Sequence, residues 1–181
     1  MLISECSFTS GDFTYVIRNA KGTDAKALSE LRLLIDGETE NMDREPGEAY
    51  MDETAFQTLI REDAEQPHNL LLVAEAEGSL VGYCRCQGST LKRFSHRVEF
   101  GICVLKAYWG YGIGKALLTQ SVSWADANGI KKMMLSVLET NTKAIVLYGR
   151  LGFMVEGMLK KDRLLSDGRY YSTVIMGRVQ G

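Results

Sequence analysis

One glycine-rich stretch constrains the fold of this chain more than any other feature. It is YWGYGIGKALL, Tyr108 to Leu118, in which Gly110, Gly112 and Gly114 alternate with bulky residues just before a helical pattern begins. Glycine adopts positive φ without strain and lets another molecule come close to the backbone. Free backbone N–H groups at the start of a helix bind anions, helped by the helix dipole. The stretch therefore predicts a strand-to-helix turn that cradles a phosphate, although a tight turn alone would also explain the glycines.

The periodicity on either side of this stretch predicts an α+β fold. Alternating apolar residues indicate strands, and apolar residues on one arc indicate helices. We expect strands at 14–21, 69–78, 79–88, 97–105, 131–139, 153–161 and 169–179, and helices at 24–37, 53–63, 113–128 and 142–151. This order predicts a single domain over residues 1–181, with a mixed sheet of about seven strands and about four helices on its faces.

Two familiar phosphate-binding motifs fit the glycine stretch poorly. The P-loop pattern GxxxxGK[ST] fails at two positions, because Ala116 follows Gly114-Lys115 and Trp109 stands where the first glycine belongs. The dinucleotide fingerprint GxGxxG belongs early in a βαβ unit, whereas this stretch follows several expected strands. A cradle of a different kind is needed.

Two motifs resemble those of the GNAT N-acetyltransferase superfamily. The segment Trp109 to Gly114 is similar to its acetyl-CoA loop, [Q/R]-x-x-G-x-[G/A], with Trp109 in place of the usual Gln or Arg. Downstream, NTKAIVLYGRLGF resembles N-x-x-A-x-x-x-Y-x-x-x-G-F at every fixed position, which are Asn141, Ala144, Tyr148, Gly152 and Phe153. The resemblance covers about residues 14–179. It implies a centrally splayed sheet, acetyl-CoA as co-substrate, and transfer of the acetyl group to a primary amine in a ternary complex.

The resemblance also implies which residues hold acetyl-CoA. The backbone of the strand before the loop would meet the pantetheine arm, and one N–H there, at Cys103 or Val104, would polarise the thioester carbonyl. Lys115 and Lys143 lie in the first turns of two helices, where a bound phosphate would offset the unfavourable helix dipole. The implied contacts are Cys103, Val104, Trp109, Gly110, Tyr111, Gly112, Ile113, Gly114, Lys115, Asn141 and Lys143.

Two residues are candidates for proton transfer. Tyr148 resembles the family's general acid for the departing thiolate, and a buried core tyrosine is the alternative. Glu99 is the preferred general base, because strand alternation places it on the same face as Gly101 and Cys103. The alternatives are that Glu99 pairs with Arg97 or Arg85, or that Glu139 is the base.

The acceptor site is predicted less sharply. In the family, the loop between the first two helices lines the acceptor pocket, and here it carries five acids: Glu38, Glu40, Asp43, Glu45 and Glu48. They suit a cationic amine such as a polyamine or aminoglycoside, and amino acids and protein amino groups stay open as acceptors. We expect Glu38, Glu40 and Tyr170 to bind substrate; a solvated loop is the alternative.

Composition excludes several other functions. A formal net charge of −2 gives no global field for nucleic acid or an anionic membrane. The four cysteines and two histidines match no zinc spacing, so we expect no metal, and the absence of a signal pattern favours the cytoplasm. Dimers are common among related proteins, which leaves a homodimer open. The main alternative to an enzyme is a non-catalytic acyl-CoA sensor or interaction domain.

Overall fold

Eight strands form one open sheet in the computed structural model, which describes residues 2–181. Their order across the sheet is β1-β2-β3-β4-β5-β6-β8-β7. The strands are β1 Cys6–Ser10, β2 Phe13–Asn19, β3 Leu70–Ala76, β4 Ser79–Gly88, β5 Arg97–Val104, β6 Lys132–Leu138, β7 Met154–Leu164 and β8 Tyr170–Val179. All neighbours are antiparallel except β5 and β6, which are parallel, so the mixed sheet predicted from the sequence is confirmed.

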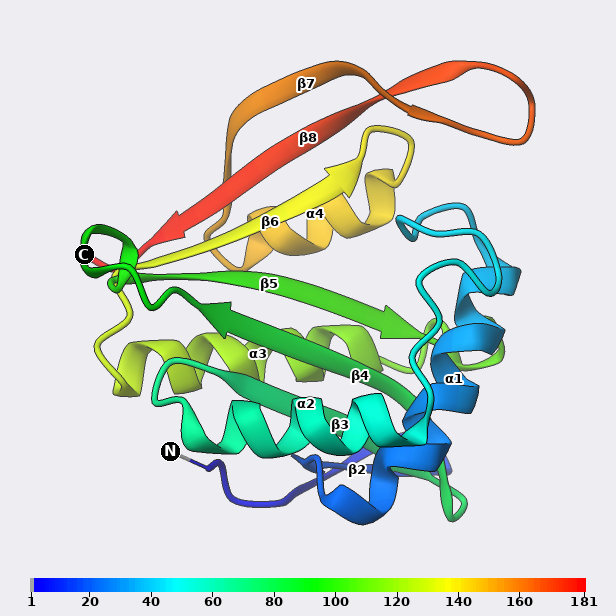
Figure 1. Ribbon diagram of the computed structural model, residues 1–181, viewed down its shortest axis with the longest axis vertical. Coiled ribbons are helices and arrows are strands. Elements are labelled where there is room, and N and C mark those ends of the chain that lie inside the picture. The colour runs from blue at the N-terminus through cyan, green and yellow to red at the C-terminus, as the bar shows by residue number, and fades with distance from the viewer. Residues whose placement is uncertain (1) are drawn as a thin grey trace.

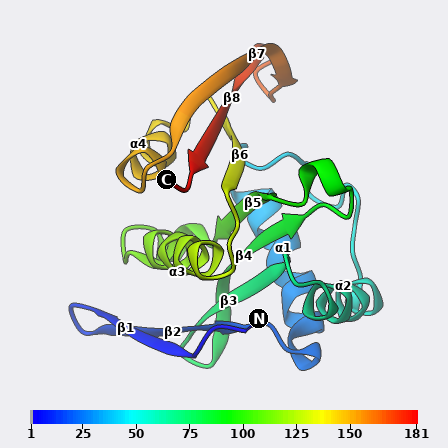
Figure 2. The ribbon, with the colours of Figure 1, turned by 90° about the vertical axis from the view of Figure 1, so that its left-hand side faces the viewer.

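Four α-helices cover the two faces of this sheet. They are α1 Ala25–Glu38, α2 Glu53–Glu65, α3 Ile113–Ala127 and α4 Thr142–Arg150. Figure 2 shows α1 and α2 on one face and α3 and α4 on the other. The larger apolar core lies between the sheet and α3, around residues such as Ile17, Leu72 and Leu117, and a smaller one joins α1 and α2 to β3 through Leu28 and Phe56.

The sheet opens at its centre, as expected. Parallel pairing between β5 and β6 is limited to three positions: Arg97 with Lys132, Val98 with Met133, and Glu99 with Met134. Beyond them the two strands diverge, so that the second half of each has no partner strand on the side facing the other (Figure 1). This divergence leaves backbone groups of β5 available to a ligand.

The N-terminal strand β1 is the element that the sequence pattern does not reveal. The pattern predicts about seven strands, whereas the structure adds Cys6–Ser10, paired antiparallel with β2. Its side chains are partly or fully exposed, so no run of buried residues marks it. An aromatic stack between Phe8 and Tyr15, with ring centroids 5.4 Å apart, stabilises the hairpin.

Candidate active site

A cavity of about 830 Å³ passes through the opening between β5 and β6. From the α1 face it is lined by the loop after α1 and by side chains of β4 and β5. From the α3 face it is lined by the glycine stretch, α3 and α4. The residues used below are Asn41, Met42, Asp43, Arg85, Gln87, Glu99, Cys103, Val104, Trp109, Gly110, Gly112, Ile113, Gly114, Lys115, Asn141, Lys143, Tyr148 and Arg150. Two molecules entering from opposite faces would meet at the opening.

The glycine stretch forms the cradle that its sequence predicts. Gly110 and Gly112 have φ of +92° and +85°, a region that side chains rarely adopt. A Cβ added at Gly110 would meet nothing within 4 Å, so the backbone borders open space. Gly112 is the N-cap of α3 and offers no side-chain cap, which leaves the N–H groups of the first turn free. These features fit a bound phosphate.

Three cations surround the phosphate side of the cavity. Lys115 lies in the first turn of α3 and Lys143 in the first turn of α4, and both are exposed. Arg150, in the last turn of α4, also lines the cavity, and the sequence motifs do not reveal it. Together with the helix N-termini they favour a ligand that carries several negative charges.

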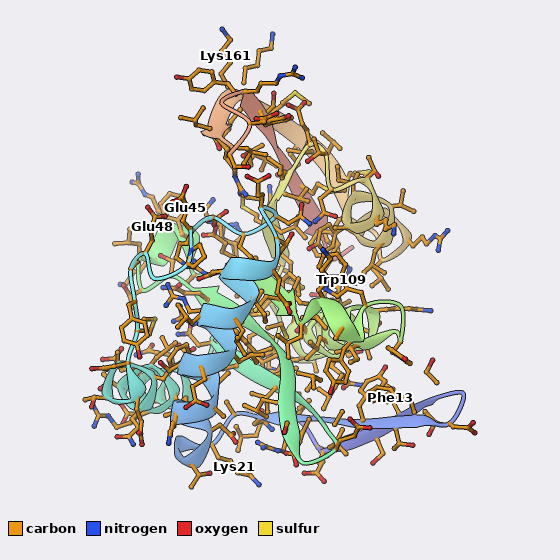
Figure 3. The ribbon with its side chains drawn as sticks, turned by 90° about the vertical axis from the view of Figure 1, so that its right-hand side faces the viewer. Phe13, Lys21, Glu45, Glu48, Trp109 and Lys161 are labelled. Atoms are coloured by element: carbon orange, nitrogen blue, oxygen red, sulfur yellow. The ribbon has the colours of Figure 1, made fainter. Side chains whose placement is uncertain are left out.

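Trp109, the departure from the usual loop pattern, joins the loop to β5. Its indole Nε1 donates a 2.8 Å hydrogen bond to the carbonyl oxygen of Val104. Trp109 lies beside the start of α3 and lines the cavity (Figure 3). A Gln or Arg at this position would present a polar side chain to the ligand, whereas the tryptophan fixes the loop to the strand.

The backbone direction of β5 decides which of the two predicted donors, the N–H of Cys103 or that of Val104, faces the opening. The N–H of Leu105 donates to the carbonyl of Val81 in β4. Successive residues of a strand direct their backbone groups to opposite edges, so Cys103 also directs its N–H toward β4 and Val104 directs its N–H toward the opening. Of the two, Val104 is the available donor.

Tyr148 projects from α4 to the cavity and is mostly buried, with 8 % of its surface exposed. Its ring packs against Phe153, with centroids 6.0 Å apart. Burial raises the pKa of Tyr148 to about 12. Among residues 2–181 no hydrogen bond to its hydroxyl is found, so that group is free to act on a ligand. Asn141 caps the same helix by accepting from the N–H of Ala144 at 3.4 Å.

Glu99 reaches the cavity from the α1 face of β5 and is exposed. The two arginines considered as its partners are engaged elsewhere. Arg85 pairs with Asp63 at 2.7 Å, and the guanidinium of Arg97 lies over the ring of Phe94 at 4.2 Å. In the part of the chain that the structure describes, Glu99 forms no ion pair. Glu139 instead accepts a 2.6 Å bond from the N–H of Ser172, outside the cavity lining.

Most of the acids at the end of α1 and in the loop that follows it do not face the cavity as the sequence suggests. Glu38 accepts from the N–H of Lys106 at 2.7 Å, and Glu40 accepts from the N–H of Ser166 at 2.8 Å. Asp43 lines the cavity but pairs with Arg163 at 2.6 Å. These acids are therefore used to fasten the loop to its neighbours. Glu45 and Glu48 lie on the outer part of the same loop (Figure 3).

Four residues expected at the site lie outside the cavity lining: Glu38, Glu40, Tyr111 and Tyr170. The ring of Tyr111 packs on Phe13 of the N-terminal hairpin, with centroids 4.5 Å apart. Tyr170 is 62 % exposed at the start of β8. Asn41 and Met42 line the cavity in place of the two glutamates, and the sequence pattern did not single them out.

Comparison with known proteins agrees with this geometry. The sequence model of the acetyltransferase (GNAT) family matches residues 35–153. The chain belongs to the GNAT acetyltransferase family. The L-amino acid N-acetyltransferase AaaT of Escherichia coli K12 is 33 % identical over 119 residues, which are 65 % of this chain and 72 % of that protein. A [ribosomal protein bS18]-alanine N-acetyltransferase of Haemophilus influenzae is 29 % identical over 129 residues, 71 % of this chain and 84 % of that protein.

Solved GNAT structures share the fold across nearly the whole chain. A GNAT acetyltransferase of Streptococcus pneumoniae superposes with a TM-score of 0.88 and 25 % identity, covering 92 % of this chain and 99 % of that one. A phosphinothricin acetyltransferase of Sinorhizobium meliloti, solved in complex with acetyl-CoA, gives a TM-score of 0.81 at 24 % identity, covering 92 % and 89 %.

This GNAT protein is an acetyl-CoA-dependent N-acetyltransferase that acts on an amine. The non-catalytic alternative has no support, because the curated relatives named above are enzymes. Of the helices that the structure describes, none combines the length and apolar character needed to cross a membrane.

Proposed function

We propose that the whole chain, 1–181, is one catalytic domain that transfers acetyl directly to a primary amine within a ternary complex. The observation that carries the proposal is a cavity that is lined by residues from both faces of the sheet. The glycine cradle and three cations line it on the α3 face, and Glu99 lines it on the α1 face. Acetyl-CoA supplies the activated acetyl group as a thioester when bound.

Binding of the co-substrate is proposed for the α3 face. Backbone N–H groups at Gly110, Gly112, Ile113 and Gly114 would hold the pyrophosphate, with Lys115, Lys143 and Arg150 balancing its charge. Val104 would present its N–H to the thioester carbonyl. Through its indole hydrogen bond, Trp109 would hold the glycine loop in a fixed position against Val104.

Two side chains would move protons. Glu99 would accept a proton from the ammonium of the acceptor, directly or through water, because its carboxylate borders the cavity without an ion-pair partner in residues 2–181. Tyr148 would donate its phenolic proton to the thiolate that leaves. Its raised pKa keeps that proton in place at neutral pH.

A covalent enzyme intermediate at Cys103 is not part of the proposal. Desolvation raises the pKa of Cys103 to about 12, so the thiol stays protonated at neutral pH. The thiolate is the nucleophilic form of cysteine, and here it would be scarce. The four free cysteines also suit a reducing compartment, which supports a cytoplasmic location. A homodimer stays a prediction.

Thiol release from acetyl-CoA in the presence of a panel of amines tests this function. Wild-type protein is expected to release coenzyme A only when an amine is present. Glu99→Gln should lower kcat/KM for the amine by about 10²- to 10⁴-fold at pH 7, because it removes the base but keeps the shape. Adding Gln87→Glu, on the neighbouring strand, to Glu99→Gln tests whether a carboxylate beside this position serves as well. An unchanged rate in Glu99→Gln would remove Glu99 from the mechanism.

A further inference from the structure

Arg85 is a charged group at the cavity that acetyl transfer itself does not use. It lies on β4 and reaches the cavity from the α1 face, where its side chain is 26 % exposed. The acids once expected to attract a cationic acceptor are fastened to other parts of the chain. An arginine at this place can bind a negatively charged group of the acceptor.

Three of the five N–H donors of Arg85 are occupied. Nε donates to Asp63 Oδ2 at 2.7 Å and Nη2 donates to Asp63 Oδ1 at 2.8 Å. Nη1 donates to Gln87 Oε1 at 2.8 Å. A guanidinium has five donors, so one N–H remains on each terminal nitrogen, with no partner for either among residues 2–181. A free N–H on a guanidinium can donate a charge-assisted hydrogen bond to a carboxylate oxygen.

The guanidinium is held in place from behind. Asp63 belongs to α2, and its side chain is only 3 % exposed. It also accepts a 2.7 Å bond from Asn69 Nδ2, and Asn69 Oδ1 accepts from the N–H of Gly88 at 2.8 Å. Because this network fixes the arginine before any ligand arrives, little side-chain entropy is lost on binding.

Glu99 lies next to Arg85 on the same face of the sheet. Gln87 is the direct cross-strand partner of Glu99, and Arg85 is the partner of Gly101 two residues further along β5. Arg85 and Glu99 are therefore diagonal neighbours, with Cα atoms roughly 7–8 Å apart. One positive and one negative group, both facing the cavity, match a ligand that carries a carboxylate close to an ammonium.

We propose that the acceptor is a free α-amino acid, whose carboxylate binds Arg85 while its amino group lies beside Glu99. The proposal rests on the acetyl transfer described above and names the acceptor of that same site. A protein N-terminus or a polyamine has no carboxylate next to its amine, so Arg85 selects against both. Arg85 determines specificity, and Asp63 is a positioning residue that acts through it.

Matched acceptors test the proposal. Rates of thiol release are measured for a panel of L-amino acids, for the amide of each and for the corresponding amine without the carboxyl group. For the preferred amino acid we expect kcat/KM to exceed that of its amide by about 10- to 100-fold. That is less than for a fully buried polar contact, because Arg85 is partly exposed. Equal values for acid and amide would overturn the proposal.

Variants separate recognition from folding. Arg85→Gln should raise KM for the amino acid about 10-fold or more and leave turnover of the amide unchanged, so that discrimination is lost. Arg85→Lys should restore part of it. Arg97→Gln, on the adjacent strand but outside the cavity lining, is the matched control and should keep full discrimination. Acetyl-CoA affinity, measured by thermal shift, shows whether each variant folds.

The possible failures are distinguishable. If amides, peptides or polyamines are acetylated and amino acids are not, the acceptor proposal falls and the transferase stands. If Arg85→Gln and Arg85→Lys both keep wild-type discrimination, the arginine serves only to join α2 to the sheet, and the proposal also falls. If acetyl-CoA binds but none of the tested amines is acetylated, the proposal of acetyl transfer fails, and the acceptor proposal fails with it.

Discussion

Tyr148 lines the cavity with a mostly buried side chain. Tyr148→Phe keeps the packing against Phe153 and removes only the hydroxyl. We expect kcat to fall by about 10²- to 10⁴-fold, the usual contribution of a general acid, while acetyl-CoA affinity changes little. Steady-state kinetics and a binding titration measure the two effects. Tyr171→Phe, which loses only a surface bond to Asp167, is the control, and equal rates in both variants would exclude Tyr148 as the acid.

The pKa of Tyr148 sets a pH dependence. A general acid works in its protonated form, and burial raises the pKa of this tyrosine from 10.0 to about 12. The proton is therefore retained through the range where an ordinary tyrosine would lose it, and the loss of activity moves to higher pH. We expect kcat at saturating substrates to hold between pH 8 and about 10, with circular dichroism confirming that the protein stays folded. A half-maximal loss at or below about pH 10, where an ordinary tyrosine titrates, in folded protein would contradict the raised pKa.

Some site residues could be placed from the sequence, and others could not. The positions of Tyr148, Glu99 and the glycines at the cavity were predictable, since strand alternation and fixed motif spacing place them. The engagement of Glu38, Glu40 and Asp43 was not, because their partners Lys106, Ser166 and Arg163 are distant in sequence. The sequence of an acidic loop is the same whether its carboxylates bind a ligand or bond to other parts of the protein.

At the scale of elements, the hairpin of β7 and β8 reaches across to the loop after α1. Register shifts between Leu159 and Arg163, with Lys161 at a φ of +54°, change the side-chain alternation along β7. Arg163 then pairs with Asp43 at 2.6 Å and approaches the carbonyl of Asn41 at 3.4 Å. Figure 3 shows Lys161 at the far end of this hairpin. The hairpin thus fastens a loop that lines the cavity.

Arg163→Ala should loosen that loop. We expect KM for the acceptor to rise roughly two- to fivefold, since an ion pair with an exposed partner is worth at most about 1 kcal/mol. KM for acetyl-CoA should not change, because the glycine cradle lies on the other face of the sheet. Arg163→Lys should recover part of the loss, and Lys160→Ala on the same strand should have no effect. A rise in KM for acetyl-CoA instead would show that the hairpin does not act through the acceptor loop.

Most element boundaries followed from periodicity, and the exceptions have physical reasons. Helices α1 to α4 and strands β2 to β8 lie close to the expected ranges, because most of them carry an apolar pattern that packs into the core. Strand β1 was missed because its five residues are short of apolar side chains and none of them is fully buried. The register shifts in β7, between Val155 and Gly157 and between Leu159 and Arg163, leave no mark in the local sequence pattern.

For the whole molecule, the central feature is that one cavity joins the two faces of a splayed sheet. The resemblance in two short motifs anticipated this splay, and the limited pairing of β5 with β6 shows it directly. The side chains proposed to select the acceptor come from α2, β4 and β5 together, so only the assembled fold brings Asp63, Arg85 and Glu99 to one place.

The measurement that tests the central claim most directly is the initial-rate pattern with both substrates varied. If both molecules occupy the cavity at once, double-reciprocal plots for acetyl-CoA at several fixed amino-acid concentrations intersect, and Cys103→Ala retains the pattern. Parallel lines, together with an acetylated protein detected by mass spectrometry in the absence of acceptor, would show transfer through the enzyme itself and contradict the account.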